Sequence, residues 1–168
     1  MFTRNRVIMT GDFAHIFDLS SLIERWPVIL PHYRYVRLLD QSSDGLQRRA
    51  VMSAWRNILP VSWKTLQTII PPQNGNADSA RILYIHIGGV TKGMEVEWIF
   101  RTLSEGRYEV SITHDWQPNW PLVGNIAARL IGRFIVANIA DKTLATIKKR
   151  VENRLAAEPG SSEKVGTH

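Results

Sequence analysis

Five polar side chains are suited to act on a carbonyl group held in an apolar site: Tyr33, Arg56, Tyr84, His86 and His114. Each can donate a hydrogen bond, and a neutral histidine can also accept a proton. These interactions are stronger in a dry cavity than in water, which competes for them. Hydrogen bonding to buried partners is the favoured interpretation of the set, with acid–base chemistry on a bound carbonyl as the alternative. Tyr33 and Arg56 are the two catalytic candidates.

Several other chemistries lack the residues that they need. The chain has no cysteine, which excludes disulfides, thiolate metal sites and cysteine catalysis. It has no G-x-S-x-G motif, and Gly88-Gly89 is not a phosphate-binding loop. His86 and His114 would need a third ligand to hold a metal ion, and Glu95 is predicted to point to the opposite face. We therefore predict no metal and no other cofactor.

Large aromatic side chains offer surfaces on which a flat molecule can stack. The chain has six tryptophans, which is many for 168 residues. Core packing is the alternative for each of them, and a fold with a cavity favours Trp55, Trp63 and Trp98. The residues predicted to line a ligand site are Trp26, Trp55, Trp63, Gln67, Tyr84, His86, Met94, Trp98, His114, Leu130 and Phe134.

Most of these side chains lie on predicted strands. Runs with β character, separated by turn residues, cover residues 3–10, 33–40, 46–56, 61–70, 81–87, 94–103 and 108–117. In the last two runs polar and apolar residues alternate, so that one face is polar and the other apolar. This pattern predicts an antiparallel sheet with one solvated face and one covered face.

Helical patterns follow the first strand and end the chain. A first helix follows Asp12, and a capping box at Ser21 predicts a second short helix that ends at Trp26-Pro27. A long helix over residues 122–155 supplies the cover for the sheet. We expect one α+β domain over residues 1–155 and a disordered tail over 156–168.

Short segments in this order resemble the polyketide cyclase/dehydrase family of the START-like superfamily, whose helix-grip fold is a strand, two short helices, six strands and a long helix. The segments are Glu24–Pro27, Leu30–Tyr33, Val36-Arg37, Met52–Arg56, Gly93–Trp98, His114-Asp115 and Ile131–Phe134. The resemblance covers about residues 3–153. It implies a curved sheet of about seven strands wrapped around the long helix, with a hydrophobic cavity between them.

The resemblance implies two kinds of function. One is the binding of a lipid, quinone or similar apolar molecule, as in proteins similar to the coenzyme Q-binding chaperones. The other is the cyclisation or dehydration of a polyketide tethered to an acyl-carrier protein. In aromatase/cyclases a tyrosine and an arginine face the pocket. Tyr33 matches the tyrosine, but Gln67 stands where the arginine would be and carries no charge. We expect ligand binding first and a cyclase as the alternative.

Charge and hydropathy limit location and partners. The net charge is +6, and no apolar run is long enough for a signal peptide or a transmembrane helix. We expect a cytoplasmic protein, with peripheral attachment to an anionic membrane as a further option. The basic residues are dispersed, so we expect no specific nucleic-acid partner. Ile135 and Ile139 are predicted to face away from the sheet, where another part of the chain, a homodimer partner or a membrane would cover them.

Overall fold

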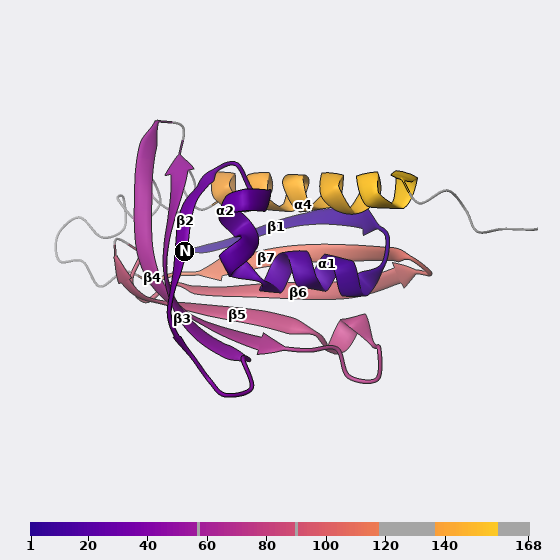
Figure 1. Cartoon of the computed structure of the whole chain (residues 1–168), viewed down its shortest axis with the longest axis horizontal. Helices are drawn as coiled ribbons and strands as arrows, with labels where there is room; N and C mark the ends of the chain where they lie inside the picture. The colour runs from indigo at the N-terminus through magenta and orange to yellow at the C-terminus, as the bar shows by residue number, and fades with distance from the viewer. Residues whose placement is uncertain (57, 90, 118–136, 158–168) are drawn as a thin grey trace, which may run out of the picture.

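A seven-stranded antiparallel sheet, covered on one face by helices, forms the body of the molecule (Figure 1). The computed structural model describes residues 1–56, 58–89, 91–117 and 137–157. Its strands have the order β1-β7-β6-β5-β4-β3-β2. They are β1 (Phe2–Thr10), β2 (Tyr33–Gln41), β3 (Gln47–Arg56), β4 (Leu59–Ile70), β5 (Arg81–Gly89), β6 (Glu95–Ser104) and β7 (Arg107–Asp115).

All seven predicted strands are present, and their ends differ from the prediction by two residues or fewer. The predicted division into two faces is also correct. On β6 the side chains of Val96, Trp98 and Phe100 are buried, whereas Glu95 and Arg101 at alternate positions are exposed. The predicted α+β helix-grip fold is therefore confirmed, with the core on the concave face of the sheet.

The segment between β1 and β2 contains two helices and a single 3-10 turn. Helix α1 (Phe13–Ser21) begins after Asp12, whose side chain accepts a hydrogen bond from the His15 amide. The 3-10 turn η1 (Ile23–Arg25) leads into α2 (Trp26–Ile29). The predicted helix from Ser21 to Trp26-Pro27 is wrong: Ser21 ends α1, and Trp26 begins α2. Proline lacks an amide donor and suits a first helical turn, so Pro27 lies in the first turn of α2 instead of ending a helix.

Helix α4 (Ala137–Ala157) covers the concave face and packs along β1 (Figure 1). Four side chains at helical spacing are buried beneath it: Ala140, Leu144, Ile147 and Val151. Polar contacts fix the helix at both edges. Lys148 donates to the Ile8 carbonyl at 2.6 Å, and Arg150 donates to the Ile29 carbonyl at 2.8 Å. The predicted start of this helix at Leu122 lies outside the described residues.

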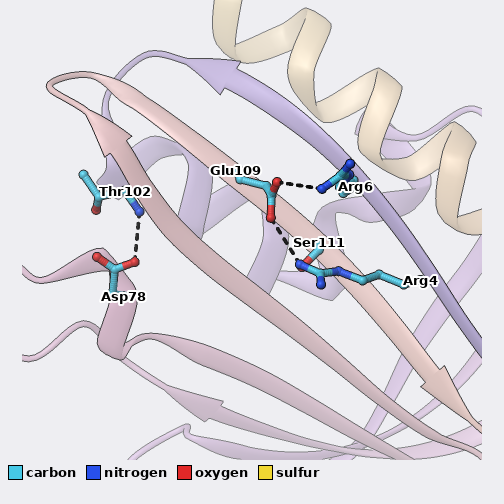
Figure 2. Close-up of polar contacts among 6 residues, drawn as sticks. All are labelled: Arg4, Arg6, Asp78, Thr102, Glu109 and Ser111. Atoms are coloured by element: carbon cyan, nitrogen blue, oxygen red, sulfur yellow. Dashed lines mark hydrogen bonds and ion pairs between the residues drawn. The ribbon is translucent and has the colours of Figure 1, made fainter.

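The outer face of the sheet carries ion pairs. Figure 2 shows Arg4 and Arg6 of β1 reaching the carboxylate of Glu109 on β7, at 3.1 and 3.5 Å. Arg4 also lies 3.5 Å from the Ser111 hydroxyl. Asp78 of the 3-10 turn η2 (Ala77–Ser79) accepts from the Thr102 amide at 3.0 Å. These contacts leave the apolar face as the place for a ligand.

In the described part of the chain, no helix combines the length and apolar character needed to cross a bilayer.

Candidate ligand-binding site

A cavity lies between the concave face of the sheet and helix α4, and α2 closes one side of it. Its volume is about 70 Å³, counted as space for the centres of water-sized atoms. One water needs roughly 10–15 Å³ on such a measure, so the space suits several heavy atoms, about the size of a single ring. The enclosed part of the cavity is therefore narrow.

Aromatic rings form a connected wall around this space. Trp26 of α2 lies between Tyr33 and Trp98, with ring centroids 4.9 and 6.0 Å apart. Tyr33 in turn lies 6.3 Å from Trp63, and Trp63 stacks on His86 at 5.6 Å with 19° between the planes. All five rings line the cavity. A flat apolar molecule would meet ring faces and edges on several sides.

Two histidines bring polar atoms to the cavity without bringing charge. His86 Nδ1 lies 2.6 Å from the Thr91 hydroxyl, and His114 Nδ1 lies 3.3 Å from the Thr3 hydroxyl. Burial lowers the pKa of His86 to about 4. Burial, with a smaller contribution from His86, lowers the pKa of His114 to about 3. Both imidazoles are therefore neutral near neutral pH and can give or accept one hydrogen bond each through Nε2.

Gln67 determines how the Tyr84 hydroxyl is used. The Gln67 amide nitrogen donates to the Ser21 carbonyl oxygen at 2.8 Å and to the Tyr84 hydroxyl at 3.0 Å. The carbonyl can only accept, so this atom must be the nitrogen, and the Tyr84 oxygen must also accept. Among the described residues no acceptor takes the Tyr84 proton. Tyr84 is thus a buried donor at the cavity wall with its proton available to a ligand.

Tyr33 is linked to α4 through Thr143. The Thr143 hydroxyl donates to the Ile139 carbonyl at 2.8 Å, and His32 Nε2 lies 2.9 Å from the same hydroxyl. Burial raises the pKa of Tyr33, and a hydrogen bond with Thr143 offsets part of that rise. Burial also raises the pKa of Tyr84. Both phenols therefore stay protonated at physiological pH and act as neutral hydrogen-bonding groups.

Residues 10–143 match the model of a protein family described as polyketide cyclase / dehydrase and lipid transport. The chain belongs to this family. The match includes strands β2 to β7, only the last residue of β1, the helices α1 and α2, and the first turns of α4. None of the curated proteins matches the chain in sequence.

The fold of this family member also occurs in solved structures of proteins with low sequence identity to it. The Zhui aromatase/cyclase from Streptomyces sp. R1128 superposes with a TM-score of 0.77 at 16% identity, covering 94% of this chain and 98% of that one. A START superfamily protein from Mycobacterium smegmatis gives 0.67 at 14% identity, covering 91% and 98%. The major latex-like protein 151 from Panax ginseng gives 0.67 at 11%, covering 90% and 97%. At these identities the likeness shows a shared START-like fold.

The cavity brings together most of the residues that are predicted for the ligand site. Those that line it are Trp26, Tyr33, Trp63, Tyr84, His86, Met94, Trp98 and His114. Gln67 is fully buried but lies behind Tyr84, where Ser21 covers it. Leu130, Phe134 and the side chain of the catalytic candidate Arg56 lie outside the described part of the chain.

Two predicted positions differ in the structure. Trp55 lies outside the cavity and is 39% exposed, because its neighbour Ala54 is buried and successive strand residues face opposite ways. The prediction that Ile139 faces away from the sheet is wrong, because Ile139 lines the cavity. Among the described residues no third metal-ligating side chain joins His86 and His114.

Sequence analysis missed Thr91 and Thr143, which also line the cavity. Thr91 follows β5 in a turn, and its hydrogen-bond partner His86 is five residues earlier. The short separation of these two polar residues is a sequence signal from which their contact could be predicted. Thr143 had no comparable signal. Its role depends on which face of α4 meets the sheet, and an amphipathic pattern fixes that direction only to within a residue or two.

Proposed function

We propose that the chain binds a small, flat, apolar molecule carrying a carbonyl or similar acceptor in the cavity between the sheet and α4. The aromatic wall of Trp26, Tyr33, Trp63 and Trp98 supports the flat apolar part of this proposal. The family description includes both polyketide cyclases and lipid transport, so apolar ligands fit it.

The Tyr84 hydroxyl carries the proposal. Gln67 donates to its oxygen, which leaves the phenol proton to point to another acceptor. A buried donor without an acceptor costs about 1–3 kcal/mol, and a ligand carbonyl would recover that free energy. The two neutral histidines add donors or acceptors without the cost of burying charge. The site therefore favours a neutral ligand over an ionic one.

A matched pair of small ligands tests this proposal. Acetophenone and α-methylstyrene have nearly the same planar shape, but only acetophenone carries a carbonyl oxygen. We expect both to bind, and Tyr84→Phe should weaken acetophenone about 2- to 10-fold while leaving α-methylstyrene nearly unchanged. Isothermal titration with the full chain measures each affinity.

Tyr108→Phe is the control variant, because Tyr108 packs against Phe13 and does not line the cavity. It should leave both affinities unchanged. If neither molecule bound, cavity binding of ring-sized ligands would be refuted. If Tyr84→Phe weakened both ligands equally, the phenol would be acting through packing and the carbonyl assignment would fail.

Cyclisation or dehydration of a polyketide is the second candidate, and the presence of Tyr33 in the cavity favours it. Removal of a proton next to a carbonyl calls for a base with a pKa near the working pH. His86 and His114, with pKa values of about 4 and 3, are weak bases. Gln67 supplies no cation for an enolate, so binding remains the first proposal.

Product analysis with a supplied poly-β-ketone tests the second candidate. If the chain is a cyclase, we expect it to change the product distribution, and Tyr33→Phe should reduce that change at least about 10-fold. The variant should still bind α-methylstyrene, which separates lost chemistry from lost folding. Product ratios equal to those of the uncatalysed reaction would exclude cyclase activity on that substrate.

A further inference from the structure

The tip of the β3–β4 hairpin carries exposed apolar side chains. Ile58 is 85% exposed, Leu59 is 60% exposed, and Trp55 is 39% exposed. We call these three residues the hairpin tip. The hairpin lies at the same end of the molecule as the beginning of the described part of α4 (Figure 1). Exposed aliphatic side chains gathered at one end are typical of a surface that binds an apolar phase.

Two cations, Arg34 and Lys142, lie beside the hairpin tip, and Arg37 lies further along β2. The guanidinium of Arg34 lies 4.7 Å from the centre of the Trp55 ring, and that of Arg37 lies 5.0 Å from the Tyr35 ring. Lys142 of α4 lines a groove beside Trp55. Among the described residues no carboxylate forms an ion pair with any of these three cations. Their charges are available to an anionic partner.

A shallow, open groove lies beside the hairpin tip. It is lined by Pro31, His32, Trp55, Ile58 and Lys142. His32 in the groove is hydrogen-bonded to Thr143, which lines the cavity. The groove and the cavity are therefore separated at this point by one hydrogen-bonded pair of side chains.

We propose that the hairpin tip, with Arg34, Arg37 and Lys142, docks the protein onto the surface of an anionic lipid bilayer. Aliphatic side chains and tryptophan enter the interface between headgroups and acyl chains, and the cations contact lipid phosphates. A nucleic acid would satisfy the cations but would leave Ile58 and Leu59 in water, so the bilayer fits the whole surface better. Docking would set the groove, and behind it the cavity wall, against the lipid.

Vesicle flotation of the full chain tests the proposal. We expect binding to vesicles of phosphatidylcholine with added phosphatidylglycerol, and much weaker binding to phosphatidylcholine alone or at high salt. Arg34→Gln and Arg37→Gln should each weaken binding about 5-fold. The pair Ile58→Ser and Leu59→Ser should weaken it at least about 10-fold.

Control variants come from the β6–β7 turn, at the opposite end of the molecule (Figure 1). Leu103 is 44% exposed, and Arg101 and Arg107 are exposed beside it. Leu103→Ser and the pair Arg101→Gln and Arg107→Gln should leave binding unchanged. Unchanged binding of α-methylstyrene to the hairpin variants would show that the cavity is intact, so docking and ligand binding are tested separately.

Several results would overturn the proposal. These are no vesicle binding by the natural chain, equal binding to neutral and anionic vesicles, or equal losses in hairpin and control variants. Binding to an oligonucleotide but not to vesicles would replace the bilayer with a nucleic acid as the partner. Quenching by brominated lipids gives a further check, because Trp55→Phe should reduce the quenching if Trp55 enters the interface.

Discussion

At the scale of single residues, the cavity combines polar atoms with an absence of charge. Gln67 occupies the position where the family resemblance implies an arginine, and it orients Tyr84 by donating to its oxygen. His86 and His114 stay neutral because burial opposes protonation. The cavity wall therefore offers hydrogen bonds to a neutral ligand and no fixed cation from the residues described.

The low pKa of His114 predicts a specific loss of stability in acid. In the unfolded chain His114 binds a proton near its ordinary pKa of 6.5, whereas in the folded chain its pKa is about 3. Folding stability therefore falls as the pH drops through this window. Between about pH 7 and about pH 5 the loss from His114 is about 2 kcal/mol.

Urea unfolding of the natural chain and of His114→Gln at both pH values measures the contribution of His114 to the pH dependence of stability. The variant should lose about 2 kcal/mol less stability than the natural chain over the same interval. His32 and His86 titrate in both proteins, so their contributions largely cancel in the comparison. Equal pH dependence in the two proteins would show that His114 is not held neutral by burial.

Strand alternation predicts the two faces of β6 and β7, but it does not predict how deep a residue lies in the cavity. Tyr84, His86 and His114 were assigned to the site from the sequence and do line the cavity. Gln67 faces the same side, yet the last residue of α1 lies over it. The depth of a residue along the cavity depends on where a distant helix ends, which no local pattern encodes.

At the scale of elements, α4 packs closely against the body of the protein where Val151 meets Gly11. A Cβ built on Gly11 would lie 2.5 Å from the Cγ1 atom of Val151, which is below any normal contact distance. Gly11 is buried in the turn that joins β1 to α1, and Val151 is buried on α4. This contact determines how closely the C-terminal half of α4 can pack on the body of the protein.

Gly11→Ala should therefore destabilise the protein by about 1–3 kcal/mol through overpacking. Val151→Ala should also destabilise it, by leaving a cavity, but the double variant should be less destabilised than the sum of the two. Thermal and denaturant unfolding of the four proteins complete the cycle. Simple additivity would show that the two residues do not press on each other.

The sequence predicted the strands more accurately than the short helices. Turn residues separate all seven runs, and alternation adds a repeated signal in the last two, so each predicted strand end lies within two residues of the observed one. The segment around Trp26-Pro27 holds a single proline that is compatible with either the end or the start of a helix. Burial of Trp26, whose indole donates to the Leu19 carbonyl at 3.0 Å, favours the start.

At the scale of the whole molecule, a concave sheet and one helix enclose a single hydrophobic core, part of which is a narrow cavity. Met52 and Met94 line the cavity, whereas Met9 is fully buried in the core and does not line it. Phe13, Phe17 and Phe100 fill the other part of the interior with edge contacts. The division between open and filled space follows from side-chain volumes, which periodicity in the sequence does not report.

The methionines allow the central claim to be measured directly. With ¹³C-methyl methionine in the full chain, titration with acetophenone is followed by methyl NMR. We predict that the Met52 and Met94 signals shift together and saturate, whereas the Met9 signal stays in place. No change of the Met52 and Met94 signals at saturating acetophenone would contradict a ligand site between the sheet and α4. Equal shifts of the Met9, Met52 and Met94 methyl signals would contradict it as well.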